Sequence, residues 1–174
     1  EYYTYDVIDS TLHAWEKEYG EDEHYFFTDY GIIYNLDTIG FSSQHNLPIF
    51  GVKISENANF PDEDKPRLLI LGQCHAEEIY GVEIAMSIIE CFLNPEQCWD
   101  EYINIRPYLL NILEISLEKI ELWVVPTHNP DGLRVVHGYC EQDITKTEDA
   151  CIGDWIEDPT YRKNSRDAVN FDIF

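Results

Sequence analysis

His75 and Glu78 are the residues of this sequence whose types and spacing best suit metal chemistry. They lie three positions apart, directly after an apolar run. If a helix begins near Glu78, the imidazole on the turn and the carboxylate on the first helical turn can converge on one point, where the helix dipole favours an ionised carboxylate. Zinc accepts this nitrogen and oxygen combination, but a catalytic zinc takes three protein ligands. On its own, such a pair is more often a hydrogen-bonded histidine beside a solvated acid.

Two apolar segments are predicted to position these residues as buried strands. The run Leu68–Leu71 is apolar throughout, as is typical of a strand covered on both faces in the middle of an α/β sheet. Gly72 then frees the backbone to turn, and ligands in such sheets collect outside the carboxyl ends of the strands. A second strand over 120–125 leads into residues 126–132, PTHNPDG, whose Asn-Pro-Asp-Gly run is a strong turn signal.

The whole chain is predicted to be one α/β domain, residues 1–174, with a mixed central sheet flanked by helices as an α/β/α sandwich. Helical spacing of apolar residues from Ile79 to Ile89 predicts a helix that packs on the sheet. After Gly132 the chain is expected to form a long loop as far as Pro159. The remaining expected elements are helices over 5–19, 78–93 and 99–113 and strands over 34–40, 49–55, 67–71 and 121–125.

Charge excludes some classes of partner. The 174 residues include 34 acidic and 11 basic ones, a net charge of −23, which should repel nucleic acid and anionic membrane surfaces. No apolar run approaches the roughly 20 residues of a membrane span. We therefore expect neither nucleic-acid binding nor a membrane-spanning segment.

The five cysteines favour an oxidising compartment. Cys91 and Cys98 could meet across a short turn, and Cys140 and Cys151 flank an acidic insertion, which would leave Cys74 free. Free buried thiols are the alternative, because sequence alone cannot fix the connectivity. The pattern predicts a secreted or otherwise extracytoplasmic protein.

Five segments, taken together and in order, resemble the zinc carboxypeptidase family, the carboxypeptidase A-like metallopeptidases. Any one of them is a weak signal, but the series extends over nearly the whole chain. The resemblance implies a zinc-dependent hydrolase that acts on the C-termini of peptides or proteins. The matching segments are residues 3–8 (YTYDVI), 39–54 with IGFS and LPIFGVKI at its ends, 72–78 (GQCHAEE), 125–132 (VPTHNPDG) and 161–164 (YRKN).

By this resemblance, His75 and Glu78 would be the first two zinc ligands and Arg162 the arginine that polarises the scissile carbonyl. Zinc activates water and acts as a Lewis acid, and a guanidinium stabilises the oxyanion that develops during attack. Two positions depart from the family pattern. Glu77 stands where the family often has an arginine, which puts the substrate preference in doubt, and Tyr161 often corresponds to a tryptophan.

The family's remaining site residues have no counterpart before Phe174. These are the Asn-Arg pair that grips the terminal carboxylate, the third zinc ligand, the mobile tyrosine and the general-base glutamate. We therefore expect the chain to be roughly the N-terminal half of a catalytic domain, and inactive or nearly so by itself. His128 and, less well, His137 are alternative candidates for the third ligand, although a turn-stabilising or solvent-facing role suits His128 better.

Two other functions stay open at this stage. A zinc amidase or deacylase on the same fold would differ in how it recognises the end of its substrate. A non-catalytic binding module would have kept the fold and lost the third ligand and the base. His13, His24 and His45 are expected to be surface or half-buried residues with no part in either function.

Overall fold

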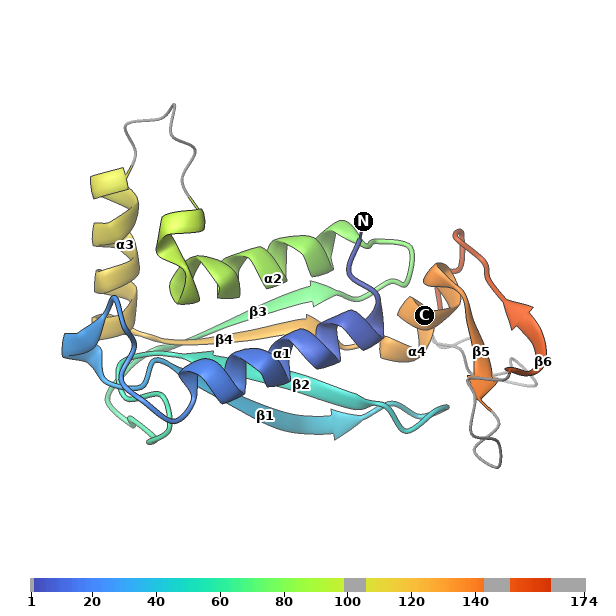
Figure 1. Ribbon diagram of the computed structural model, residues 1–174, viewed down its shortest axis with the longest axis horizontal. Helices are drawn as coiled ribbons and strands as arrows, with labels where there is room; N and C mark the ends of the chain where they lie inside the picture. Colours follow the sequence, from blue (N-terminus) through green and yellow to red (C-terminus); the bar gives the residue numbers. More distant parts are fainter. Residues whose placement is uncertain (1, 99–105, 143–150, 164–174) are drawn as a thin grey trace.

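The computed structural model describes residues 2–98, 106–142 and 151–163. The helices over Tyr5–Tyr19 and Tyr80–Leu93 run roughly in line with the strands of a sheet, whereas the helix over Arg106–Lys119 stands across that direction, and a separate two-stranded sheet follows near the end of the described chain (Figure 1). The elements are α1 (Tyr5–Tyr19), η1 (Thr28–Tyr30), β1 (Tyr34–Phe41), β2 (Pro48–Ile54), β3 (Arg67–Gln73), α2 (Tyr80–Leu93), η2 (Pro95–Gln97), α3 (Arg106–Lys119), β4 (Glu121–Thr127), α4 (Pro130–His137), β5 (Tyr139–Gln142) and β6 (Cys151–Ile156).

The main sheet is mixed, with the strand order β1-β2-β4-β3. β2 pairs antiparallel with both β1 and β4, whereas β3 and β4 run parallel, with Leu68 opposite Leu122 and Leu71 opposite Val125. The predicted mixed α/β architecture is confirmed. Because β3 and β4 are parallel neighbours, the loops that follow them leave the sheet at the same end, next to the carboxyl ends of both strands.

α1 and α2 lie side by side and share one apolar core with the sheet (Figure 1). The amide of Tyr3 donates to Glu83 Oε1 at 2.7 Å at one end, and the Tyr19 hydroxyl donates to Asn94 Oδ1 at 3.1 Å at the other. The predicted apolar stripe of α2 is confirmed, because four of its members are fully buried and the fifth is partly buried against the core. These are Val82, Ala85, Met86, Ile89 and, partly buried, Ile79.

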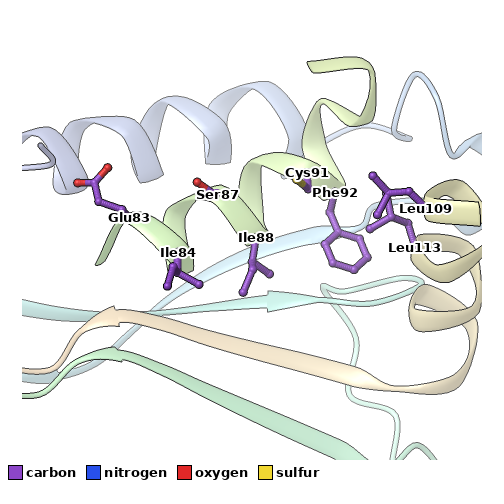
Figure 2. Close-up of a pocket in the computed structure, with 8 residues that line it drawn as sticks. All are labelled: Glu83, Ile84, Ser87, Ile88, Cys91, Phe92, Leu109 and Leu113. Atoms are coloured by element: carbon purple, nitrogen blue, oxygen red, sulfur yellow. The ribbon is translucent and has the colours of Figure 1, made fainter. Parts of the chain in front are cut away.

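β3 is not covered on both faces, so that prediction is wrong. Leu68, Leu69 and Leu71 are exposed, Leu69 to 58%. Among the described strands β3 pairs only with β4 and stands at the edge of the sheet, and no described element buries the face from which Leu69 and Leu71 both project. An apolar hollow of about 400 Å³ lies between α2 and α3, where Ile84 and Ile88 point from α2 to one side (Figure 2).

The segment from Asn129 onwards is not the turn and long loop that the sequence predicted. Asn129 is the N-cap of α4, its side-chain oxygen accepts from the amide of Gly132 at 3.1 Å, and Pro130 occupies the first helical turn. Proline suits that position because its missing N–H would have no helical partner. β5 and β6 then pair antiparallel, while residues 143–150 of the predicted loop lie outside the described residues.

Two further expectations have definite outcomes. The predicted helix over 99–113 is observed as α3 from Arg106 to Lys119, with residues 99–105 outside the described part. His24 is buried rather than at the surface: its Nε2 donates to Leu93 O at 2.9 Å while its Nδ1 accepts from the amides of Phe26 and Phe27. Burial lowers its pKa, which fits this neutral ring.

The cysteine prediction holds where the structure tests it. Cys91 and Cys98 form a disulfide across η2, and Cys74 is free and exposed. Cys140 is also disulfide-bonded, but the side chain of its expected partner, Cys151, lies outside the described residues. None of the described helices is long and apolar enough to span a membrane.

Candidate metal centre

Two glycines hold the loop that carries His75 and Glu78 between β3 and α2. A Cβ at Gly72 would lie 2.2 Å from the carbonyl oxygen of Pro126, and one at Gly81 would lie 2.3 Å from the carbonyl oxygen of Gly72. Such contacts leave no room for a side chain. The backbones at the end of β3 and the start of α2 can therefore pack this closely only with glycine at both positions. The intervening loop is short and fixed at both ends.

A buried polar network joins this loop to the end of β4. Gln73 is fully buried, its amide nitrogen donates to the carbonyl of Ala76 at 2.9 Å, and its side-chain oxygen accepts from the Thr127 hydroxyl. The same hydroxyl accepts from the amide of Asn129 at 3.1 Å. Because buried polar groups are costly to leave unpaired, this network fixes the two loops against each other.

Asn129 brings a third segment to the same place. Its Nδ2 donates to the carbonyl of Cys74 at 3.2 Å and to that of Lys163 at 3.3 Å, and the amide of Ala76 donates to the carbonyl of Arg162 at 3.3 Å. The chain around Arg162 is thus tied by backbone contacts to the loop after β3, although the two are more than 80 residues apart in sequence. No local sequence signal predicts these contacts.

The three predicted site residues lie together. His75 Nδ1 is 3.0 Å from Glu78 Oε1, and that oxygen is 3.4 Å from Arg162 Nη1. Arg162 Nη2 is 3.1 and 3.3 Å from the two ring nitrogens of His75. α2 begins at Tyr80, two residues later than predicted, so Glu78 lies just before the first helical turn, where the positive end of the helix still favours its charge.

Glu77 completes the cluster, and its role was not predicted. Arg162 Nη1 donates a short hydrogen bond to Glu77 Oε1. Burial raises the pKa of Glu77, but a backbone hydrogen bond and the hydrogen bond and charge of Arg162 outweigh it, so the pKa lies below its ordinary value. The hydrogen bond with Glu77 is in turn the largest cause that raises the pKa of Arg162.

The donor set fits part of a zinc site. An imidazole nitrogen and a carboxylate oxygen within reach of one point match two of the three protein ligands of a catalytic zinc. Among the described residues, no group of three His, Cys, Asp or Glu side chains is placed to hold a metal ion. Neither His128 nor His137 forms such a group with His75 and Glu78 in the observed geometry.

His128 nevertheless lies near the cluster. Burial, and to a smaller extent the charge of His75, lower its pKa, and its Nδ1 is buried without a hydrogen-bond partner among the described residues. Its backbone amide donates to the carbonyl of Gln73 at 3.3 Å, which agrees with a turn-stabilising role. His137 also has a buried nitrogen without a described partner, and burial lowers its pKa against the charge of Glu83.

A family model with the description zinc carboxypeptidase matches residues 24–173, which is most of the chain. The chain belongs to the zinc carboxypeptidase family. The match includes the loop with His75 and Glu78 and the segment with Arg162, so it agrees with the resemblance seen in the sequence. The comparison with curated proteins found no match.

Solved structures of other proteins share the fold. Carboxypeptidase A from Helicoverpa armigera is similar with a TM-score of 0.54 and 19% identity, over 76% of this chain and 26% of that one. Thrombin activatable fibrinolysis inhibitor gives a TM-score of 0.54 and 16% identity, over 76% of this chain and 27% of that one. At such identities the likeness shows the fold alone. The chain spans about a quarter of the length of these structures.

Proposed function

We propose that the protein is a zinc-dependent metallocarboxypeptidase that hydrolyses C-terminal peptide bonds, and that this chain supplies two zinc ligands and the carbonyl-polarising arginine. The observation that carries the proposal is the meeting of His75, Glu78 and Arg162 outside the carboxyl ends of β3 and β4, in a chain of the zinc carboxypeptidase family. Arg162 lies 87 residues after His75 in the sequence, so the tertiary fold brings it to the loop that carries His75 and Glu78.

Each residue suits the role proposed for it. His75 would bind zinc through a ring nitrogen and Glu78 through a carboxylate oxygen, and zinc when bound supplies a Lewis acid and an activated water. Arg162 carries a permanent charge and several donors at the same place, so it can bind the scissile carbonyl and stabilise the negative charge that develops there. A third ligand and a general base are required from residues that have no assignment here.

A second candidate, a zinc amidase or deacylase on the same fold, is favoured by one observation. Glu77 stands where the family often has an arginine, and its carboxylate pairs with Arg162. A positive contact for the substrate is therefore missing at that position. Hydrolysis of a peptide with a free C-terminal carboxylate but not of its C-terminal amide would favour the carboxypeptidase, and the reverse preference would favour the amidase.

The proposed substrates and location follow from the same features. Peptide or protein C-termini are the substrates that membership of the family suggests, and the net charge of −23 makes nucleic acid an unfavourable partner. We propose a secreted or otherwise extracytoplasmic protein, because disulfides such as Cys91–Cys98 form and persist in oxidising compartments.

Zinc binding by the full-length protein tests the assignment. His75→Ala and Glu78→Gln should each weaken zinc binding by at least roughly 100-fold in a competition titration, since loss of a direct ligand should exceed the 10–100-fold typical of outer-shell changes. Arg162→Lys should keep zinc and lower kcat on the order of 100-fold. His13→Ala, at an exposed histidine of α1, and Glu114→Gln, at an exposed glutamate of α3, are the matched controls. Unchanged zinc content in both ligand variants would refute the proposal.

A further inference from the structure

We propose that Glu77 is a positioning residue for Arg162: it holds one amino group of the guanidinium, so that the other is directed at the reaction centre. This inference rests on the proposed function, because it assigns Arg162 the carbonyl-polarising role. It concerns a position at which this chain differs from the family's usual arginine, so it is specific to this sequence.

The two ends of the guanidinium have different surroundings. Nη1 faces the carboxylates, with a short hydrogen bond to Glu77 Oε1 and a longer contact of 3.4 Å to Glu78 Oε1. Nη2 lies over the imidazole of His75, at 3.1 and 3.3 Å from its nitrogens. The carboxylates therefore engage one amino group, and the other stands beside the histidine proposed to bind zinc.

Glu77 is better placed than Glu78 to hold the arginine. The oxygen of Glu78 that contacts Arg162 is the same one that contacts His75, so this oxygen belongs to the proposed metal-binding pair. Among the described residues, no contact of the Glu77 side chain with His75 competes in this way. Its side chain is 26% exposed against 56% for Arg162, so the carboxylate is the more enclosed partner and the arginine the one with freedom to lose.

The contact also acts together with the backbone. The amide of Ala76 donates to the carbonyl of Arg162, and Glu77 follows Ala76 directly, so the same two segments meet through a main-chain bond and through an ion pair. An arginine side chain has many rotamers, and a planar guanidinium that is already held by a partner loses less freedom on binding. With the backbone of Arg162 fixed, the short contact with Glu77 restrains the far end of the side chain.

Glu77 also depends on Arg162. Glu77 Oε2 is buried and has no hydrogen-bond partner among the described residues, so Arg162 is the cation that compensates this carboxylate. An arginine at position 77 would instead place two guanidinium groups side by side. A salt bridge of this exposure contributes little to stability, so a folding measurement alone cannot test a positioning role.

The test uses the full-length protein with Glu77→Ala, the isosteric Glu77→Gln, and Glu114→Gln as a control that removes one exposed carboxylate from α3. Glu77→Ala should lower kcat roughly 10- to 100-fold, the range for a misplaced catalytic group, with KM and zinc affinity within about threefold of the parent protein. Glu77→Gln should recover part of kcat, because its amide oxygen still accepts from Nη1. In the Arg162→Ala background, Glu77→Ala should have no further effect.

A spectroscopic readout separates positioning from general damage. With ¹⁵N-labelled arginine, the side-chain resonances of Arg162, assigned through Arg162→Lys, should show hindered rotation in the parent protein and in Glu114→Gln, and averaged signals in Glu77→Ala. If kcat and these resonances in Glu77→Ala match those of Glu114→Gln, the positioning role is overturned while the zinc ligands stand. Loss of zinc from both Glu77 variants would also overturn it, because Glu77 would then support the metal site.

Failure of the proposed function gives a different pattern. If His75→Ala keeps its zinc, the metal assignment fails whatever Glu77 does. If Arg162→Ala keeps full kcat, Arg162 has no catalytic role for Glu77 to support, and both ideas fall. The resonances of Arg162 report the Glu77 contact in either case.

Discussion

Glu121 lies at the start of β4, at the end of the sheet opposite the candidate site, and a mutation there tests what stabilises that end. Its side chain is only 2% exposed. Oε1 accepts from Lys53 Nζ at 3.0 Å and from the amide of Asp62 at 3.1 Å, and Oε2 accepts from Arg67 Nε at 2.8 Å. The perturbation is Glu121→Gln, which keeps the shape and removes the charge.

The structure sets the size of the effect. Burial raises the pKa of Glu121, but the hydrogen bonds from Arg67, the amide of Asp62 and Lys53 outweigh it and lower the pKa from its ordinary value of 4.5 to about 2. At about 1.4 kcal/mol per pKa unit, this shift corresponds to roughly 3 kcal/mol of folding free energy at neutral pH. Because the Arg67 side chain is 60% exposed and therefore screened by solvent, about 2–3 kcal/mol is the better expectation.

The pH dependence has a definite sign. A carboxylate with a lowered pKa in the folded state stabilises the protein above its unfolded pKa of 4.5 and loses that effect as the pH falls towards 2. Glu121→Gln should therefore lower the free energy of unfolding by about 2–3 kcal/mol at pH 7, and the gap to the parent protein should narrow progressively below pH 4.5.

Urea unfolding at a series of pH values is the assay. The control is Glu118→Gln, an exposed glutamate that pairs with Lys119 on the surface and should change stability by less than about 1 kcal/mol. A loss in Glu121→Gln no larger than in the control at pH 7, or a gap that does not narrow between pH 4.5 and pH 2, would refute the reasoning.

Three further predictions concern a close glycine contact, a buried carboxylate and an exposed strand. Gly81→Ala should cost about 1–3 kcal/mol in urea unfolding and weaken zinc binding in titration, because a Cβ would meet the carbonyl oxygen of Gly72 at 2.3 Å and displace the loop between them. Asp131→Asn should cost about 2 kcal/mol by thermal unfolding, because buried Asp131 accepts from the Ser42 hydroxyl and from the amides of Gln44 and His45. Leu69→Lys should reduce self-association of this chain in sedimentation velocity, because β3 presents an exposed apolar edge.

The local sequence pattern predicted the positions and buried faces of the helices better than it predicted the burial of the strands. The bounds of α1 and the buried stripe of α2 follow from apolar residues at helical spacing, which depends only on near neighbours. The same reasoning could not place β3, because Leu68–Leu71 has the composition of a central strand and its exposure is set by which elements pack on the faces of the sheet. That choice is made by tertiary pairing, and no pattern within the segment records it.

The Asn-Pro-Asp-Gly segment failed for a different reason. An N-cap residue is non-helical, a proline at the first helical position has its φ preset, and both features are shared with a tight turn. What decides for a helix is the apolar continuation Leu133, Val135 and Val136, which is buried. Reading past Gly132 for that continuation would have found α4.

The candidate site was less predictable the farther apart its residues lie in the sequence. His75 and Glu78 are close enough for spacing alone to bring them together, and that proximity is observed. Arg162 was assigned only through the family resemblance, since nothing local links it to residue 75. The contact of Glu77 with Arg162 was not predicted at all. The positioning role of Glu77 is a proposal from the structure. The roles of the three site residues and the single-domain organisation stay predictions.

The loop with His75 and Glu78 and the side chain of Arg162 are held in place by different contacts. Mutations of these contacts should therefore have different effects. The loop that carries His75 and Glu78 is fixed by two glycines and by the buried Gln73 network, so the two proposed ligands are oriented by the fold itself. Arg162 has a fixed backbone but an exposed side chain, whose described partners are the carboxylates of Glu77 and Glu78 and the ring of His75. Damage to the glycines should therefore appear first in zinc affinity, and damage to Glu77 first in turnover. If Gly81→Ala lowered kcat while zinc affinity stayed unchanged, the fold would not be what orients the ligands, and this division of the site would be wrong.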